Sequence, residues 1–306
     1  MIARRCVLAG LGAVLADPAR AQFLPGLLNA AERPSNDPYT LAETTNGAAG
    51  FANASGRTPV DGRRQPGERT LVLVLGGQSY FASTVNDSYL PTNSRVHNFS
   101  IYDGGTYACA LPLLGCSTGL VQVAGAPIGH FGLRLADKLI NAAVCQRVIL
   151  VPIAVNATSI SDWATGGVLN SRLTVTMSRL AASGLTPDAF LWDQGTNDYF
   201  YGTTQAAWQS GFASVVSTLV AAGMRCPIFV ASSSYYPTLM PTTSATIEAA
   251  QAAVINHAAT PPIWVGGNQD SIGAGGRQAG GHENATGADS LAGLWQTALH
   301  AYGAPF

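Results

Sequence analysis

Five short apolar runs, separated by helical patterns, constrain the fold of this chain more than any other feature. The runs lie at 71–75, 148–155, 189–192, 227–231 and 263–265, and each is suited to a buried strand. Strands that alternate with helices form βαβ units, in which the strands run parallel. The pattern predicts an α/β protein with a mainly parallel five-stranded sheet, whose functional residues lie at the carboxyl ends of the strands.

Helical patterns lie between the runs. The clearest, at 204–223, repeats apolar residues with helical spacing and has Thr204 as its N-cap. The last helix is predicted to begin with a capping box formed by Thr286 and Asp289. Residues 84–128 contain turn residues and short apolar pieces, and we interpret them as a loop-rich insertion beside the first strand.

The N-terminus has the pattern of an export signal. Two arginines precede a short apolar stretch, and a small-x-small cleavage site ends at Ala21. We therefore predict a secreted or periplasmic protein with a signal peptide at 1–21. An extended N-terminal segment at 22–69 and a single domain at 70–306 follow it.

Composition excludes several kinds of partner. The 16 basic and 17 acidic residues nearly cancel, and no Lys/Arg cluster follows the signal, so we expect no nucleic-acid partner. No apolar stretch after the signal is long enough to span a membrane. No group of His and Cys residues has the spacing of a zinc site, so we expect no metal, and nothing implies a cofactor.

Four cysteines follow the signal, namely Cys109, Cys116, Cys145 and Cys226. An oxidising compartment would permit two disulfides among them, with three possible connectivities. We favour the pair Cys109–Cys116, which would close a short loop.

The first apolar run ends in the sequence Gly76-Gly77-Gln78-Ser79. The glycines let the chain turn sharply and place the serine at the start of the next helix, where amide dipoles favour negative charge. This position suits a nucleophile of acyl transfer, whose attack creates an oxyanion. An ordinary serine N-cap is the alternative. The Gly-x-Ser-x-Gly motif of α/β-hydrolases is absent, because Phe81 occupies its last glycine position.

Two further strand ends carry small or polar residues. The stretch VNATSISDW at 155–163 could turn backbone N–H groups toward the Ser79 hydroxyl, or could form an ordinary Asn/Ser turn. The stretch WDQGTND at 192–198 contains Gln194 and Asn197, whose amide side chains could donate to an oxyanion or form an Asx-turn.

His282 is the histidine best placed to act as a general base. It lies in a glycine-rich loop after the last predicted strand and just before the last helix, where it could approach Ser79. The other histidines are assigned to helical patterns or to the neighbourhood of the insertion: His257, His300, His97 and His130. A structural role is the alternative for any single histidine, and the position of His282 relative to Ser79 favours catalysis.

Together these residues resemble the SGNH, or GDSL-like, hydrolase superfamily, and in particular its branch of sialate O-acetylesterase-like and acetylxylan esterase-like carbohydrate esterases. The resemblance covers about residues 70–303 and rests on four blocks in order. Gly77-Gln78-Ser79 is similar to the nucleophile block, and Thr158 to Trp163 to the second block. GTND, at 195–198, is similar to the third block, and GGHENATGADSLAGLW, at 280–295, to the last.

The resemblance implies a three-layer α/β/α flavodoxin-like fold and a secreted serine esterase that needs no cofactor. Ser79 would be the nucleophile and His282 the base. The backbone N–H groups of Ser79 and Ala157, with Asn197 or Gln194, would hold the oxyanion. The substrate would be an O-acylated, most often acetylated, carbohydrate or another small ester.

Two departures from the family pattern matter. The glycines of the second block are Asn156 and Ala157 here. The acid that the family carries three residues before the histidine is replaced by Ala279. Either Asp270 or Glu283 then supplies the carboxylate, or the enzyme works as a Ser–His dyad, and we favour Asp270. Two other functions stay open: a broad short-chain esterase or lipase without sugar preference, and a non-catalytic carbohydrate-binding relative.

Overall fold

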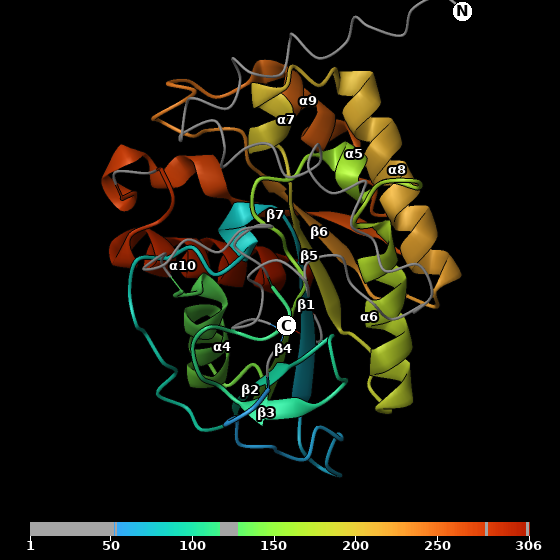
Figure 1. Ribbon diagram of the computed structural model, residues 1–306, viewed down its shortest axis with the longest axis vertical. Helices are drawn as coiled ribbons and strands as arrows, with labels where there is room; N and C mark the ends of the chain where they lie inside the picture. The colour runs from blue at the N-terminus through green and yellow to red at the C-terminus, as the bar shows by residue number, and fades with distance from the viewer. Residues whose placement is uncertain (1–51, 53, 117–127, 279–280, 304–305) are drawn as a thin grey trace, which may run out of the picture.

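A seven-stranded sheet forms the centre of the molecule, with strand order β3-β2-β4-β1-β5-β6-β7 (Figure 1). The computed structural model describes residues 52, 54–116, 128–278, 281–303 and 306, so the predicted signal at 1–21 lies outside the described residues. The strands are β1 Thr70–Gly77, β2 Val96–Phe99, β3 Thr106–Ala108, β4 Arg147–Pro152, β5 Ala189–Asp193, β6 Ile228–Ser232 and β7 Ile263–Asn268. All neighbouring strands run parallel except the β2–β3 pair.

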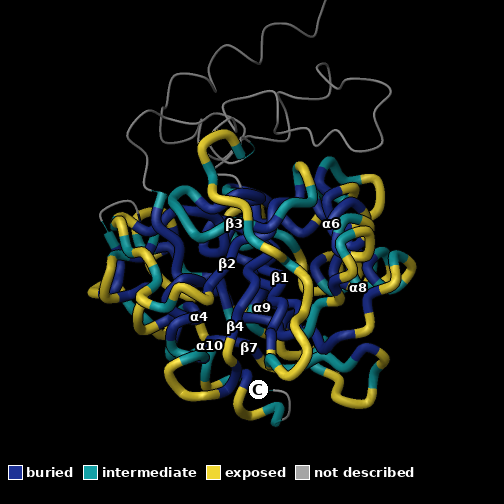
Figure 2. The backbone as a smooth tube through the Cα atoms, turned by 90° about the horizontal axis from the view of Figure 1, so that it is seen from below, coloured by how far each residue is buried: buried dark blue, intermediate teal, exposed yellow. Residues whose placement is uncertain are grey.

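Helices cover both faces of this sheet. The α-helices are α4 Phe131–Asn141, α5 Ile160–Trp163, α6 Asn170–Ala182, α7 Thr196–Phe200, α8 Gln205–Ala221, α9 Ala245–Ala253 and α10 Ala285–Tyr302. Short 3₁₀ helices are η2 Ser79–Phe81, η3 Gln269–Ile272 and η4 Ala274–Gly276. Figure 2, seen from below, shows buried backbone between α4 with α10 on one side and α6 with α8 on the other. The predicted three-layer α/β/α arrangement is confirmed.

The alternation of side chains along β1 explains the two cores. Val72 and Val74 point to one face and pack with Leu173 of α6 and Trp208 of α8. Leu71, Leu73 and Leu75 point to the other face and pack with apolar residues of α4 and α10. Because successive side chains of a strand point to opposite faces, a strand buried on both faces must be apolar throughout. This is the reason why the apolar runs identified the sheet.

The five predicted strands are confirmed as β1, β4, β5, β6 and β7, but the predicted count of five strands is too low. Strands β2 and β3 lie within 84–128, which we predicted to be a loop-rich insertion. Polar residues conceal β2. Its buried Asn98 donates to the carbonyls of Phe99 and Leu114 and accepts from the Leu114 N–H, so a polar side chain is satisfied inside the core.

The start of α8 agrees with the sequence-based prediction, and the start of α10 differs from it. Thr204 caps α8 as predicted, because its side chain accepts from the N–H of Ala207 at 3.2 Å. Helix α10 begins at Ala285, one residue before the predicted start at Thr286. Asn284 is its N-cap, and it accepts from the N–H of Gly287 at 2.9 Å. The predicted capping box was wrong, because the cap lies two residues before Thr286. Asparagine is at least as good a cap as threonine.

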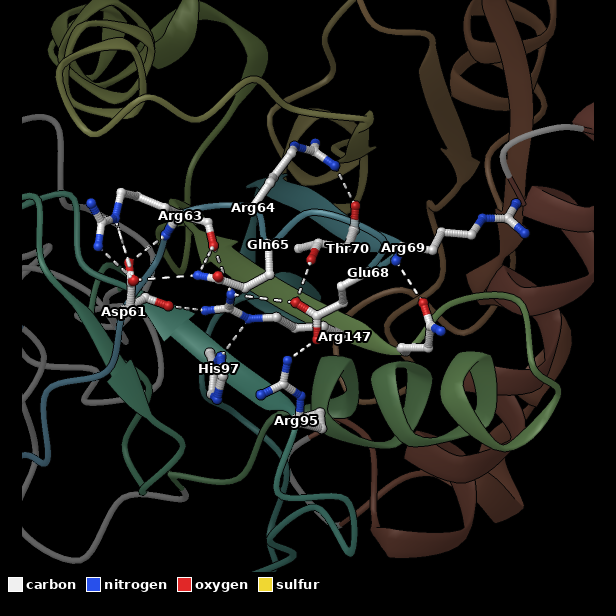
Figure 3. Close-up of polar contacts among 11 residues, drawn as sticks. Asp61, Arg63, Arg64, Gln65, Glu68, Arg69, Thr70, Arg95, His97 and Arg147 are labelled. Carbon is white, nitrogen blue, oxygen red and sulfur yellow. Dashed lines mark hydrogen bonds and ion pairs between the residues drawn. The ribbon is translucent and has the colours of Figure 1, made fainter.

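The part of the predicted N-terminal segment that the structure describes anchors to the amino-terminal edge of the sheet (Figure 3). The buried Arg147 of β4 donates from Nη1 to the carbonyl of Arg63 at 3.0 Å and from Nη2 to that of Asp61. Arg64 forms an ion pair with Asp188, just before β5, at 2.6 Å. The segment before β1 is therefore tied to β4 by a buried arginine and to the start of β5 by an exposed one.

The four described cysteines are free thiols, so the predicted Cys109–Cys116 disulfide is not formed. Cys116 points into the core, where its Sγ lies 3.2 Å from Ser83 Oγ and 3.5 Å from the carbonyl oxygen of Leu113. No described helix is long and apolar enough to cross a membrane.

Candidate active site

The carboxyl end of β1 forms the floor of the candidate site. Gly77 pairs with Asp193 of β5, and the N–H of Gln78 donates to the Asp193 carbonyl at 2.7 Å. Gly77 has φ +115°, and a Cβ atom there would lie 1.9 Å from the Asp193 carbonyl oxygen. Only glycine fits this turn. The predicted sharp turn is present, and it places Ser79 at the start of the short helix η2.

Gln78 connects three strand ends through its buried amide side chain. Its Nε2 donates to Thr196 Oγ1 at 2.8 Å and to Ser233 Oγ, just after β6, at 3.1 Å. Its Oε1 accepts from the N–H groups of Gly195 at 3.2 Å and Asn197 at 3.4 Å. The residue before the candidate nucleophile is thus fixed by the ends of β5 and β6 and is a structural part of the site.

The second block follows β4 in the chain and lies beside this turn. Ala157 has φ +61°, in the left-handed region that favours glycine. The Ile160 N–H donates to both carboxylate oxygens of Asp198, at 3.0 Å to Oδ1 and 3.2 Å to Oδ2. Burial raises the pKa of this carboxyl to about 6. This contact joins the second block to the third and fixes the backbone around Ala157. Helix α5 lies within the second block and α7 begins within the third, and both helices lie at the same end of the molecule (Figure 1).

The structure distinguishes the two candidate amides of the third block. Gln194 Nε2 already donates to the carbonyl of Thr158 at 2.6 Å and to Asp198 Oδ2 at 2.8 Å, so both of its hydrogens are used. Asn197 Nδ2 is buried and has no hydrogen-bond partner among the described residues. An unpaired buried donor costs free energy unless something accepts from it. Asn197 therefore has the free donor capacity that an oxyanion site needs, and Gln194 does not.

His282 lies against the residue that follows Ser79. Its ring makes edge-on contacts with Tyr80, at a centroid distance of 5.8 Å, and with Tyr236, at 5.3 Å. Burial, and secondarily the Arg277 cation, lowers the pKa of the His282 imidazole to about 4. No hydrogen bond joins Ser79 Oγ to the His282 ring in the described part of the chain, and Tyr80, the residue after Ser79, contacts the ring instead.

The two candidate acids are occupied elsewhere. Asp270 accepts from the N–H of Ser234 at 2.9 Å, from Ser234 Oγ at 2.9 Å and from the N–H of Tyr235 at 2.8 Å. Glu283 is fully buried and accepts from Gln269 Nε2 at 3.1 Å, and burial raises the pKa of its carboxyl to about 7. Neither carboxylate forms a hydrogen bond with His282 within the described residues. Asp270 instead connects η3 to the turn after β6.

Sequence reasoning missed Tyr80, Tyr236 and Arg277, which surround the histidine. Arg277 is the only Lys or Arg after Arg225. In a chain with 11% charged residues, an isolated arginine five residues before the candidate base could have drawn attention to it. No group of three or more His, Cys, Asp or Glu side chains that could hold a metal occurs among the described residues.

Comparisons with known proteins agree with this fold and with the blocks that form the site. Among solved structures, a protein from Arabidopsis thaliana aligns with a TM-score of 0.58 at 16% identity, over 76% of this chain and 98% of that one. A carbohydrate acetylesterase from Xanthomonas citri aligns with a TM-score of 0.51 at 14% identity, over 76% of this chain and 57% of that one. At such identities the likeness concerns the fold alone. A search of curated proteins finds no match.

The family comparison is decisive because it covers the first three of the four blocks. A family model described as carbohydrate esterase, sialic acid-specific acetylesterase matches residues 69–256, which is more than half of the 306 residues. The matched stretch runs from the start of β1 through the Ser79 turn and the third block at 195–198. The chain therefore belongs to the sialic acid-specific acetylesterase family of carbohydrate esterases and is a hydrolase of carboxylic ester bonds.

Proposed function

We propose that the protein removes acetyl groups from O-acetylated carbohydrate through an acyl-enzyme formed on Ser79. The observation that carries this proposal is the unpaired buried donor of Asn197, at the edge of the sheet where Ser79 and the His282 loop also lie. Oxyanion stabilisation by preorganised donors is the largest single contribution in many acyl transfers. A site with such a donor beside a serine and a histidine is suited to ester hydrolysis.

The proposed reaction has two steps. His282 removes the proton from Ser79 Oγ as the oxygen attacks the ester carbonyl carbon, and the tetrahedral oxyanion accepts from the Ser79 and Ala157 N–H groups and from Asn197 Nδ2. The bond between the acyl carbon and the sugar oxygen then breaks, and His282 gives its proton to the departing sugar oxygen, which becomes a hydroxyl. A water molecule, deprotonated by His282, attacks the acetyl-enzyme, and acetate leaves as His282 returns the proton to Ser79 Oγ.

We assign the acid–base chemistry to a Ser–His dyad. The three donors to Asp270 and the one donor to Glu283 support this choice over either carboxylate as a third member. Gln194 is assigned a supporting role, because its amide fixes the second block through Thr158 and Asp198. The sugar preference follows the family description and the acetylesterase activity named for the Xanthomonas citri neighbour.

The serine mechanism is tested by Ser79→Ala with p-nitrophenyl acetate as substrate. Loss of a catalytic nucleophile typically lowers kcat by several orders of magnitude, and we expect Ser79→Ala to lower it by about 10⁴-fold or more. Ser83→Ala is the matched control, because Ser83 is also buried and lies four residues away, where it contacts Cys116. Activity of Ser79→Ala within a few-fold of the wild type, with an unchanged circular dichroism spectrum, would contradict the mechanism.

The sugar preference is tested with a substrate panel. Acetate release from O-acetylated sialic acid and acetylated xylan fragments is compared with hydrolysis of p-nitrophenyl acetate. A higher kcat/KM for one acetylated sugar supports the proposal. Equal or lower values for all sugars would identify a broad short-chain esterase.

We also propose that residues 1–21 direct export, on the basis of their three-part pattern. Cell fractionation with and without residues 1–21 tests this. Accumulation of the full-length chain in the cytoplasm would contradict it.

A further inference from the structure

Arg277 is a buried cation whose hydrogen-bond partners are all neutral. Its Nη1 donates to the carbonyl of Gly281 at 3.0 Å and to the hydroxyl of Tyr80, and its Nη2 donates to the carbonyl of Gln269 at 3.0 Å. The guanidinium also lies over the rings of Tyr80, at 4.9 Å, and Tyr235, at 5.2 Å. No ion pair with a carboxylate is formed by Arg277 in the described ranges. A buried arginine without a counter-ion needs an explanation, because desolvation of the charge is costly.

The contacts of Arg277 converge on the backbone that carries His282. The carbonyl of Gly281, the residue before His282, accepts from Arg277 Nη1, and the Gly281 N–H donates to the Gln278 carbonyl at 2.9 Å. Gly281 has φ +93°, and a Cβ atom there would lie 2.6 Å from the Tyr236 ring. The chain at 281 is thus held between a guanidinium and a tyrosine ring. Rotation of this backbone would move the imidazole.

The other end of the same contacts reaches the nucleophile turn. Tyr80 follows Ser79 directly, is fully buried, and contacts both the Arg277 guanidinium and the His282 ring. Its hydroxyl also donates to the carbonyl of Tyr235 at 2.8 Å. One connected set of contacts therefore links the turn of Ser79 to the loop of His282. No carboxylate takes part in it.

Arg277 is also the group whose charge acts on His282. The other ionisable groups beside the histidine are Tyr80 on η2, Tyr236 after β6 and Glu283, while Asp193 on β5 acts on Tyr80 and Asp270 on η3 interacts with Arg277. Burial raises the pKa of each of them: that of Asp193 to about 8, that of Glu283 to about 7 and that of Tyr236 to about 12. These groups are biased toward their neutral forms, whereas the arginine stays charged.

We propose that Arg277 and Tyr80 are positioning residues for His282, which hold the imidazole beside the nucleophile turn in place of the carboxylate that Ala279 cannot supply. This inference rests on the proposed function, because it gives His282 the part of the base. It assigns to a cation and a phenol the orienting task that an acid performs in a triad. Burial, with the Arg277 cation as the smaller cause, lowers the pKa of the His282 imidazole, so the base is weaker but stays unprotonated to lower pH.

The first test is a titration that needs no enzymatic activity. In protein labelled with ¹⁵N-histidine, the His282 resonances are identified by their loss in His282→Gln, and their titration is followed in the wild type, Arg277→Met, Arg277→Lys and Arg57→Met. We expect Arg277→Met to move the titration of His282 to higher pH, because removal of a nearby cation favours the protonated ring. Arg277→Lys, which keeps the charge, is expected to hold it near the wild-type value. Arg57 is the matched control, because it too donates to two carbonyls, those of Ala110 and Pro112.

The second test is kinetic and concerns orientation. We expect Arg277→Met to lower kcat by about tenfold to hundredfold with KM within about twofold of the wild type, since small misplacements of a reacting group have effects of this size. Tyr80→Phe, which keeps the ring and removes the hydroxyl, is expected to lower kcat several-fold. In Arg277→Met the acid limb of kcat/KM is expected to move to higher pH together with the histidine titration.

Opposite outcomes separate this inference from the proposed function. An active enzyme in which Arg277→Met leaves the His282 titration and kcat unchanged would overturn the positioning roles alone. A wild-type protein that hydrolyses no ester, but in which the titration moves as expected, would refute the proposed function and leave the role of Arg277 in place. If Arg277→Met fails to fold, Tyr80→Phe carries the test, and an unchanged kcat in that variant would overturn the proposal.

Discussion

Arg147 at the amino-terminal edge of the sheet and Arg277 at the carboxyl-terminal edge are both buried, but their surroundings differ. Each guanidinium nitrogen of Arg147 has an acceptor: His97 Nδ1 for Nε at 2.9 Å, and two backbone carbonyls for Nη1 and Nη2 (Figure 3). Arg277 leaves its Nε without a partner among the described residues. The same side chain is fully satisfied at one edge and only partly satisfied at the other.

The contrast extends to the neighbours of each arginine. The labelled side chains at the amino-terminal edge in Figure 3 that are buried or half-buried have no unpaired buried polar atom: Glu68, Thr70, His97 and Arg147. At the carboxyl-terminal edge, the side chains that have one include Asp193, Asn197, Gln269, Arg277 and Glu283. Unpaired buried groups are rare in native proteins and need a reason. We infer that charge at the amino-terminal edge serves stability, and that unused hydrogen-bonding capacity at the other edge serves catalysis.

The largest effect on this comparison is expected from Asn197→Ala. Removal of one oxyanion donor typically lowers kcat by about 10²–10³-fold, and KM should change little. Asn98→Ala is the matched control, because Asn98 is a buried asparagine of β2 whose donors are paired with backbone carbonyls. We expect the control to lower the free energy of unfolding and to leave kcat unchanged. Steady-state kinetics and urea unfolding of both variants distinguish the roles, and equal kcat losses in the two variants would remove Asn197 from the mechanism.

Arg147→Met should show the reverse behaviour. The substitution leaves His97 Nδ1 and two carbonyls without their donor, and breaking such a buried charged cluster costs about 3 kcal/mol in the free energy of unfolding. Because the amino-terminal edge lies at the opposite ends of the strands from Ser79, kcat at a temperature where the variant is folded should not change. A tenfold loss of kcat with unchanged unfolding would show that the two edges are not separate in function.

The pH dependence of activity tests the state of the base. Only neutral His282 can accept a proton, so kcat/KM should rise with pH through the pKa of about 4 and stay level above it. At pH 5, an imidazole of ordinary pKa would be only about 3% neutral. We therefore expect most of the activity to persist at pH 5. A midpoint of the kcat/KM profile near pH 6.5 would contradict a lowered pKa of His282.

Folding must be checked in the same pH range. The pKa values of His97, His130 and His282 are each lowered to about 4, chiefly by burial. Between about pH 6.5 and 4 the unfolded chain binds more protons at these histidines than the folded one, so they destabilise the fold as pH falls. Circular dichroism at each pH separates loss of structure from protonation of the base.

The smallest expected effect concerns the backbone at Ala157. Its φ of +61° is unfavourable for alanine by about 1–2 kcal/mol, whereas glycine adds about 0.5–1 kcal/mol of unfolded-state entropy. Ala157→Gly should thus stabilise the protein by about 0–1.5 kcal/mol and should keep kcat, because the N–H remains. Ala143→Gly, at φ +56° after α4, is the matched control for stability. A large loss of kcat in Ala157→Gly alone would show that the methyl group itself shapes the site.

The sequence predicted those parts of the molecule in which one residue type satisfies one physical need. The Ser79 turn could be predicted because only glycine fits at Gly77, and the central strands because burial on both faces requires apolar residues. Strand β2 could not be predicted, because its His97 and Asn98 are satisfied by residues distant in the chain.

The chemistry of the site was predictable only in part for the same reason. Gln194 and Asn197 are both amides at one strand end, and only their neighbours show which has an unused donor. Asp270 was a reasonable acid by position along the chain, but its oxygens are engaged by Ser234 and Tyr235. The role of Arg277 depends on contacts with Tyr80 and Gly281, which no sequence spacing reveals.

Covalent labelling tests the central claim, that the carboxyl-terminal edge carries a nucleophilic serine activated by His282. The folded protein is treated with a fluorophosphonate, and the modified peptide is mapped by mass spectrometry in the wild type, Ser79→Ala and His282→Gln. The account predicts one phosphonyl group on Ser79 in the wild type, none in Ser79→Ala, and labelling slowed by orders of magnitude in His282→Gln. Modification of a different serine, or rapid labelling of Ser79 without His282, would contradict it.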